Sequence, residues 1–470
     1  MDLTRLKHLI RSKPEQLIVI AIKGRYPFIT DLRGLDLSNC ISILLVNSFY
    51  VNQTPQHLFD HFDLVGCLDI GQFWLGGALS RLDTLELPQL DRAIDQLLNE
   101  FESADPNFDV TRVRLAVLEE QFVRLAAKIR QQYGIPGARP EDVDRFTDKA
   151  CMKRTATDGG LDTAKYIITT PAVFLKSNSK KEQVEQMLGY PIMVKPLHGV
   201  GGAGINFWVR FLSLKIGLIP ISGITKIDSR SQLESWLSNH QDPSTEFLIE
   251  EYINGVEYHC LALLQSSNIQ LFPSPLYVYG HSFFTGISQG WPSCMDVERD
   301  IEKCEIVEKF LHETIRVFQP PDATLIFVQT FLTSDGQMKF SELAIRPPGM
   351  IGSVMFLENS GISPESVQIM AQTRPIDFST MREKPKKFCS NLVYPKVQGF
   401  VKNINQLPVG ALKSEVKVVH IAKIGDETKS ATNIGDMAVR VLLWNEDGEV
   451  MRKDIDWLRA NYQPLVIAKN

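Results

Sequence analysis

The chain has 470 residues, a formal net charge of −5 at pH 7 and a pI near 6.0, which argue against nucleic acid or an anionic membrane surface as its main partner. Its length allows several domains, and its 44% hydrophobic and 22% charged content is ordinary for a globular protein. No apolar stretch is long enough to span a bilayer, the first residues lack the apolar core of a secretory signal, and the 7 cysteines form no C-x-x-C pair. We therefore expect a cytoplasmic protein with reduced thiols and no zinc or iron–sulfur site.

Residues 1–140 alternate predicted strands with predicted helices. Short apolar runs predict three buried strands, Gln16–Ile22, Ile41–Val46 and Leu64–Ile70. Apolar residues at helical spacing predict two amphipathic helices, Gln89–Phe101 and Arg112–Tyr133, the second ended by Gly134 and Pro136. We expect a small α/β layer domain here.

The most informative stretch is Tyr190–Gly204, which reads YPIMVKPLHGVGGAG. Its apolar run Ile192–Val194 predicts a strand that delivers Lys195. A loop with four glycines follows: Gly199, Gly201, Gly202 and Gly204. Glycines let backbone N–H groups turn inward as a phosphate cradle, and a lysine at the strand end adds a charge for the same phosphates.

The surroundings of this loop exclude two familiar phosphate motifs. In a dinucleotide fold the glycines would open a helix, but Ile205–Phe211 is rich in β-branched and aromatic residues and predicts a strand. In the Walker pattern the lysine follows the glycines, whereas Lys195 precedes them. The segment alone leaves a phosphate-covering flap and an ordinary hairpin loop equally open.

Three further segments surround the loop in the sequence. Asp148-Lys149 precedes it, and FLIEEYINGVEYHCLALL follows it with an acidic pair at the end of a predicted strand. The third segment predicts a β-hairpin that turns at Ser334-Asp335-Gly336 and leads to Glu342 and Arg346. In this order and spacing the segments resemble the ATP-grasp superfamily over residues 145–350, most closely its carboxylate–amine ligases, among which are the L-amino acid ligases and the related biotin carboxylase.

The resemblance implies which residues bind the nucleotide. Lys149 and Lys195 would hold the ATP phosphates beneath the flap Gly199–Gly204. Catalysis would rest on Lys195 and on Arg346, which would steady the transferred phosphoryl group or the acyl intermediate. Phosphoryl transfer spreads negative charge over oxygens that cations and N–H dipoles stabilise.

The same resemblance assigns the base and the ribose. Glu250 would accept a hydrogen bond from the adenine amino group, and the backbone of Glu251 and Ile253 would read the rest of the base. Glu257 would bind the ribose hydroxyls. Without the resemblance, Lys149 would be a solvated helix residue and Glu250-Glu251 an exposed acidic pair. Lys153 is expected to be a solvated helix residue. His259 and His281 could line the acceptor pocket or be structural.

The implied metal site departs from the family pattern. Glu342 would bind Mg²⁺, or Mn²⁺, but Gln329 stands where the family usually has a carboxylate, and Ala344 where it often has Asn. A glutamine offers a carbonyl oxygen without charge, and Mg²⁺ prefers carboxylate. Either Glu342 and ATP hold the metal, or a neighbouring acid substitutes, or the enzyme is impaired.

The resemblance implies an α/β and α+β multidomain ATP-grasp fold. We expect an N-terminal α/β domain (1–140), an entry and β-rich lid (141–255), a catalytic floor (256–385) and a C-terminal β-rich cap (386–470). Ser274–Ser293 predicts a loop or hairpin beside the acceptor site. The cap is expected to hold three strands and a closing helix: Phe388–Tyr394, Glu415–Ala422, Ala438–Trp444 and Met451–Tyr462.

The implied activity is an ATP-dependent, ADP-forming ligase that joins a small carboxylate to an amine through an acyl phosphate. A ligase of specialised metabolism, such as one that forms mycosporine-glycine, and a catalytically impaired ATP-binding protein are the alternatives. Carboxylation is disfavoured because the sequence shows no biotinyl-carrier segment. The partners would be small molecules, with a homodimer left open.

Overall fold

The computed structural model describes residues 1–24, 30–70, 87–197, 225–239, 244–279, 293–349, 351–379, 387–431 and 437–468. The glycine loop Gly199–Gly204, the strand expected at Ile205–Phe211 and His281 therefore lie outside the described residues. None of the described helices is long and apolar enough to cross a membrane.

The N-terminal layer is a parallel sheet in the order β3-β2-β1-β4. Its strands are β1 (Leu17–Lys23), β2 (Cys40–Asn47), β3 (Leu64–Leu68) and β4 (Val113–Val117). Side chains alternate between two cores: Ile18, Ile20 and Ile22 join the core that includes α1 (Leu3–Ser12) and α3 (Pro88–Ala104), whereas Val19 and Ala21 join the opposite one. Burial on both faces explains why these strands are apolar throughout.

The long helix expected over Arg112–Tyr133 is wrong in its first part. Val113–Val117 is strand β4, and the helix α4 begins only at Glu120 (Glu120–Tyr133). The run VRLAV pairs in parallel with β1, so tertiary pairing overrides the local helical periodicity. The predicted end is confirmed, because Gly134 follows the helix with φ +71°.

The lid sheet is antiparallel, in the order β5-β8-β6-β7. It is made of β5 (Tyr166–Thr169), β6 (Ile192–Pro196), β7 (Thr225–Ile227) and β8 (Phe247–Glu251), and it is reached through α5 (Pro140–Thr147) and α6 (Lys149–Asp158). Phe247 and Ile249 pack into a core with residues of α7 (Pro171–Lys176) and α10 (Arg230–Ser238). Side chains alternate along a strand, so Leu248 and Glu250 take the opposite face.

An eight-stranded sheet, in the order β13-β12-β9-β10-β11-β14-β18-β16, forms the floor of the molecule. Its first five strands are β13 (Met338–Ala344), β12 (Thr324–Thr333), β9 (Gly255–Gln265), β10 (Asn268–Tyr279) and β11 (Ser293–Val297). The expected hairpin is confirmed, with Gly336 at φ +81° in the turn between β12 and β13. Of the loop or hairpin expected over Ser274–Ser293, the described residues fit the hairpin: β10 runs to Tyr279 and pairs antiparallel with β11, which begins at Ser293.

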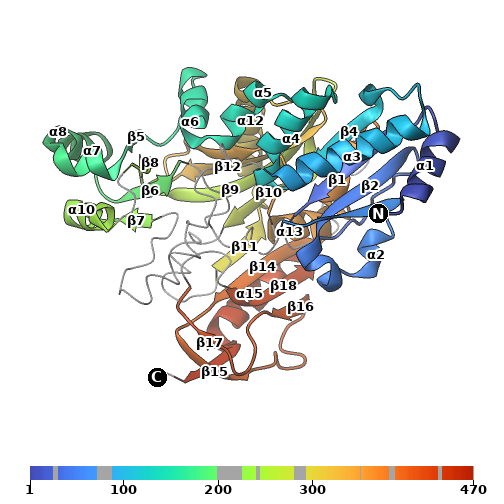
Figure 1. The fold of residues 1–470 in the computed structure, drawn as a ribbon. Coiled ribbons are helices and arrows are strands. Elements are labelled where there is room, and N and C mark those ends of the chain that lie inside the picture. The colour runs from blue at the N-terminus through green and yellow to red at the C-terminus, as the bar shows by residue number, and fades with distance from the viewer. Residues whose placement is uncertain are drawn as a thin grey trace.

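Helices cover this large sheet. They are α12 (Ile301–Phe318), α13 (Ile351–Ser360) and α14 (Pro364–Met370). In Figure 1 the blue N-terminal layer and the green lid sheet lie at opposite sides of the large sheet. The large sheet therefore lies between the N-terminal layer and the lid sheet.

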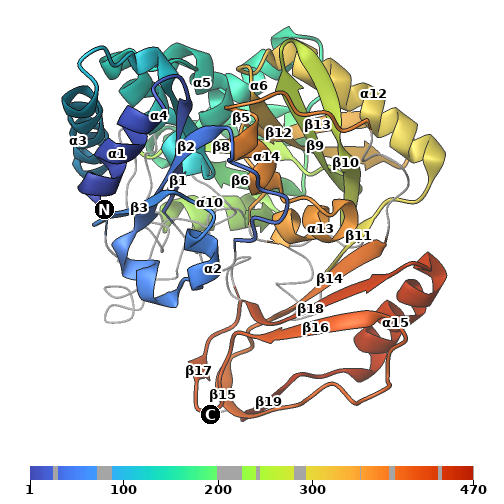
Figure 2. The same ribbon diagram turned by 90° about the vertical axis from the view of Figure 1, so that its right-hand side faces the viewer.

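The C-terminal part continues the large sheet rather than starting a new one. Its strands β14 (Phe388–Pro395), β18 (Met437–Asn445) and β16 (Glu415–His420) are the last three of the eight, with α15 (Gly448–Asn461) packed on them. A small sheet, β17-β15-β19, lies at the far end (Figure 2), formed by Glu427–Thr428, Gly399–Ile404 and Leu465–Ala468. The expected strands and helix are confirmed, while the boundaries at 140, 255 and 385 stay predictions.

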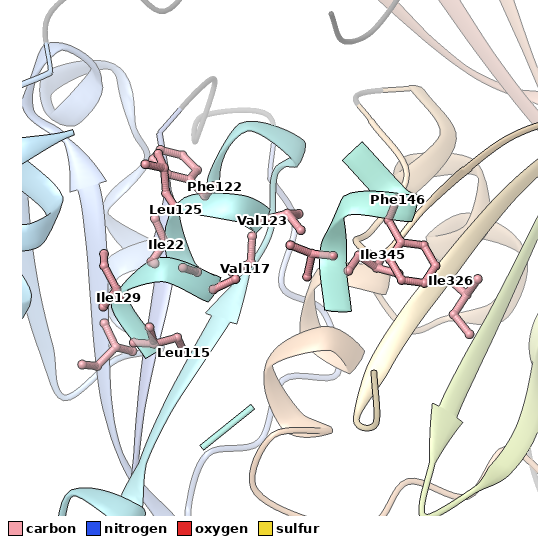
Figure 3. Close-up of a cluster of buried hydrophobic side chains, with 14 of the residues drawn as sticks. Ile22, Leu115, Val117, Phe122, Val123, Leu125, Ile129, Phe146, Ile326 and Ile345 are labelled. Carbon is pink, nitrogen blue, oxygen red and sulfur yellow. The ribbon is translucent and has the colours of Figure 1, made fainter. Parts of the chain in front are cut away.

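One apolar core joins the N-terminal layer to the hairpin. Figure 3 shows Phe122, Leu125 and Ile129 of α4 beside Ile22, Leu115 and Val117 of the N-terminal sheet. On the other side of α4, Phe146 of α5 lies beside Ile326 and Ile345 of the hairpin region (Figure 3). Buried contacts on both sides fix α4 between the two sheets, which places its first residue, Glu120, next to the hairpin.

Candidate active site

Two elements deliver lysines to one cleft between the lid sheet and the hairpin. Helix α6 begins with Lys149, and Asp148 caps it by accepting a hydrogen bond from the Cys151 N–H. Lys195 lies on strand β6 and is the cross-strand partner of Leu248, so the two side chains share one face of the sheet. The sequence also predicts a strand that leads to Lys195. The cleft is small and is lined by Lys149, Met152, Lys153, Lys195, Leu248, Ser341 and Glu342.

Glu250 lies between two lysines on the inner face of the lid sheet. Its Oε1 is 2.6 Å from Lys153 Nζ, and its Oε2 is 2.5 Å from Lys195 Nζ. Burial alone would raise the pKa of Glu250, but the two ammonium groups lower it to about 2. The carboxylate therefore stays ionised and acts only as an acceptor.

The pKa values of Lys153 and Lys195 are shifted in opposite directions. Burial lowers the pKa of Lys153, despite its ion pair with Glu250. Burial would also lower the pKa of Lys195, but the Glu250 carboxylate outweighs it and raises that pKa. The expectation that Lys153 is a solvated helix residue is wrong, because the residue is 2% exposed. Glu250 is buried too, so the exposed acidic pair that the sequence would predict without the resemblance is also wrong. Sequence reasoning missed Lys153, although its i,i+4 spacing from Lys149 on α6 could have placed both on one helix face.

Strand β8 ends at Glu251, and the next residues connect it to β9. The Glu251 N–H donates to the carbonyl of Lys165 at 3.0 Å, and the Tyr252 N–H donates to that of Pro191 at 3.2 Å. Glu251 also lies 3.5 Å from Lys339 Nζ of β13. The Glu251 N–H is thus used within the protein, which leaves its carbonyl and the Ile253 backbone for the role that the resemblance assigns.

Glu257, His259 and Gln329 form one polar cluster on the large sheet. His259 Nε2 lies 3.0 Å from Glu257 Oε1 and 2.9 Å from the side-chain amide nitrogen of Gln329. That amide also donates to Glu257 Oε1 at 3.3 Å. The His259 ring packs edge-on against Phe327. His259 is therefore part of the cluster that holds the residue expected at the ribose.

Glu342 faces Gln329 across the hairpin and reaches Lys149. The two residues are partners in the β12–β13 register, and Glu342 Oε1 lies 3.8 Å from Lys149 Nζ. Ala344 is buried opposite Phe327 and adds no ligand. Within the described part of the chain, no three His, Cys, Asp or Glu side chains are grouped to hold a metal ion. The residues fit a divalent ion that takes oxygens from Glu342 and Gln329 and the remainder from a nucleotide and water, as is usual for Mg²⁺.

Arg346 is held by a residue that sequence reasoning missed. Its Nε donates to Glu120 Oε2 at 2.8 Å, its Nη1 donates to the Pro347 carbonyl at 2.8 Å, and its guanidinium lies over the Phe327 ring. Burial raises the pKa of Glu120, although Arg346 opposes the shift. Glu120 follows the carboxyl end of a parallel strand, where open sheets place ligands, but the expected long helix concealed that position.

Solved structures share the fold of this chain. An L-amino acid ligase from Bacillus licheniformis superimposes with a TM-score of 0.68 over 97% of this chain and 100% of its own, at 16% identity. The chain has the ATP-grasp fold. An N5-carboxyaminoimidazole synthetase from Staphylococcus aureus, solved with ADP, superimposes on this ATP-grasp chain with a TM-score of 0.58 over 93% of it and 96% of its own length, at 15% identity.

Sequence comparison adds a partial match. A D-alanine–D-alanine ligase of Bacillus cytotoxicus is 26% identical over 233 residues, which are 47% of this chain and 57% of that ligase. An uncharacterized protein of Sinorhizobium fredii is 25% identical over 177 residues, 37% of this chain and 33% of that protein. The ATP-grasp chain thus matches these curated relatives over about a third to a little over half of their length. No family profile matches the sequence.

Proposed function

We propose that the protein is an ATP-dependent, ADP-forming ligase that joins a small carboxylate to an amine. One observation carries the proposal: Lys149, Lys195 and Glu342 line a single cleft of an ATP-grasp fold. Cations beside a carboxylate suit a nucleotide triphosphate and its divalent ion, because the lysines offset phosphate charge and the carboxylate offers a hard oxygen ligand.

The proposed reaction has two steps. A carboxylate oxygen of the first substrate attacks the γ-phosphorus of ATP, the bond to the β-phosphate oxygen breaks, and ADP leaves. The amine then attacks the carbonyl carbon of the acyl phosphate, loses a proton and releases inorganic phosphate. The products are an amide, ADP and phosphate.

The side chains have separate tasks in this proposal. Lys149 and Lys195 bind phosphate oxygens, and a divalent ion held with help from Glu342 supplies further charge neutralisation. Arg346 would steady the charge that develops at the acyl end. The hydrogen bond from Arg346 Nε to Glu120 fixes the plane of the guanidinium group. The other N–H groups of Arg346 would then be oriented before the substrate binds. Such preorganisation is worth most in a site that excludes water.

The direct test is a coupled assay of phosphate and ADP release. The protein, ATP and Mg²⁺ are incubated with pooled amino acids and small carboxylates, and productive pools are split until one pair remains. A ligase releases ADP and phosphate in proportion to the amide. AMP and pyrophosphate as the stoichiometric products would rule out the acyl-phosphate route.

A second candidate is an ATP-binding protein without ligase turnover. Gln329 favours it, because the amide puts no charge beside Glu342 and hydrogen-bonds to Glu257 and His259 instead. This candidate requires nucleotide binding in calorimetry with no substrate-stimulated phosphate release in any pool.

A further inference from the structure

Lys153 is more deeply buried than the two lysines expected to bind phosphate. Its side chain is 3% exposed, against 12% for Lys149 and 15% for Lys195. A buried ammonium is costly unless it is paired and hydrogen-bonded. Lys153 satisfies that condition with Glu250 Oε1 at 2.6 Å and Thr163 Oγ1 at 3.0 Å, and it lies 5.8 Å from the centroid of the Phe340 ring.

Thr163, the hydroxyl partner of Lys153, is fixed to strand β13 of the large sheet. Thr163 Oγ1 donates to the Phe340 carbonyl at 3.2 Å, and the Phe340 N–H donates to the Asp162 carbonyl at 2.7 Å. Lys153 therefore joins α6, the segment before β5 and strand β13 at one point. Because Lys153 is buried and bonded to both Glu250 and Thr163, we do not expect its ammonium group to move to a phosphate oxygen.

Lys195 is in the opposite situation. Lys195 Nζ lies 2.5 Å from the other carboxylate oxygen of Glu250, and its side chain is more exposed than that of Lys153. In the sequence, Lys195 precedes the glycine-rich segment. When Lys195 turns to a phosphate oxygen, Glu250 loses one of its two cations. Of the described residues that pair with Glu250, Lys153 then remains to keep the carboxylate ionised and to hold its plane.

We propose that Lys153 is a positioning residue for base recognition: it keeps Glu250 an ionised acceptor while Lys195 serves the phosphates, and so selects purines with a 6-amino group over purines with a 6-oxo group. The inference rests on the proposed ATP site. An ionised carboxylate accepts from a 6-amino group and repels a 6-oxo group, whereas a protonated carboxyl can donate to the latter. The low pKa of Glu250, which Lys153 helps to lower, agrees with this role.

The test compares ATP with inosine triphosphate, which carries a 6-oxo group in place of the 6-amino group. Binding of each Mg²⁺ complex is measured by calorimetry without other substrates, for the wild type, Lys153→Met and Lys149→Met. We expect Lys153→Met to weaken the binding of ATP by about tenfold and that of inosine triphosphate much less, so that the preference for ATP is lost. Lys149→Met removes a phosphate cation without touching Glu250, so it should weaken both nucleotides alike and keep the preference.

The outcomes separate the inference from the function on which it rests. A wild type that binds neither nucleotide sinks the proposed function. A wild type that prefers ATP, with a Lys153→Met variant that loses both nucleotides equally, leaves the function standing and overturns the role of Lys153. Lys153→Gln is the second neutral variant, and Lys153→Arg should restore most of the preference. If neither neutral variant folds, as judged by circular dichroism, Lys153 acts through the fold and the inference is wrong.

Discussion

Gln329 is the cross-strand partner of Glu342 in the β12–β13 pair, while its side-chain amide hydrogen-bonds to Glu257 and His259. Gln329 is thus the strand partner of the carboxylate expected at the metal, and its side chain hydrogen-bonds to the carboxylate expected at the ribose. A second acid at this position would face Glu257 across a short distance, and the amide avoids that repulsion. The consequence is a site with little negative charge of its own for a divalent ion.

Gln329→Glu is expected to tighten divalent-ion binding by about tenfold, because it adds a charged oxygen ligand beside Glu342. Mn²⁺ titrations of the nucleotide complex, followed by electron paramagnetic resonance, measure the change. Gln329→Met, which has a similar length and no oxygen, is the control and should weaken binding. Superimposable curves for all three proteins would show that position 329 lies outside the metal shell.

Lys195→Ala is expected to weaken ATP binding and to lower kcat/KM by at least about 100-fold, because it removes a cation from a partly desolvated phosphate site. Calorimetry and phosphate release measure the two effects. Lys180→Ala, on the exposed helix α8 (Asn178–Gln183), changes the same net charge without touching the cleft and should behave as wild type. Equal losses in both variants would point to long-range charge rather than to a phosphate contact.

Arg346→Ala is expected to lower kcat by about 100-fold with a smaller rise in KM, since the arginine would act on charge that develops during the reaction. Arg124→Ala is the matched control, because Arg124 lies on α4, as Glu120 does, but makes its ion pair of 2.6 Å with Asp144 of α5. Steady-state kinetics and thermal unfolding are compared for both. A loss of stability with normal kinetics in Arg346→Ala would make Arg346 a structural residue.

Acid should destabilise the protein partly through Glu250. Its pKa is about 2 in the folded protein against an ordinary value of 4.5, so its contribution is fully present above about pH 4.5 and is lost as the pH falls toward 2. The contribution is of the order of 3 kcal/mol at neutral pH. Urea unfolding between pH 6 and pH 3 measures it. Glu250→Gln should show a shallower loss of stability over this range, and parallel profiles would contradict the ion pairs.

Much of the fold could be predicted because local signals and tertiary contacts agree. Strand β1 is a short apolar run, as a buried strand requires. The turn at Gly336 and the helix end at Gly134 each follow an apolar pattern and place a glycine at positive φ, so the local sequence favours a single structure. Strand β4 could not, since its apolar residues also fit a helix and only pairing with β1 decides between them. The lost strand concealed Glu120. Lys153 was missed for a different reason: it lies on helix α6 and its partner Glu250 on strand β8, and charge pairing between elements far apart in the sequence leaves no local pattern.

The backbone link between Asp162 and Phe340 determines where the lid can turn. The Phe340 N–H donates to the Asp162 carbonyl at 2.7 Å, and β5 begins a few residues later, while Glu342 lies two residues beyond Phe340 on the same strand. If the lid sheet rotates about this link, the displacement would be small beside Glu342 and larger at the outer lid helices. Lys195 lies on β6 of the lid sheet and would move with it, whereas Glu342 would stay in place on β13. Entry and exit of the nucleotide would then reposition one phosphate cation and leave the carboxylate expected at the metal where it is.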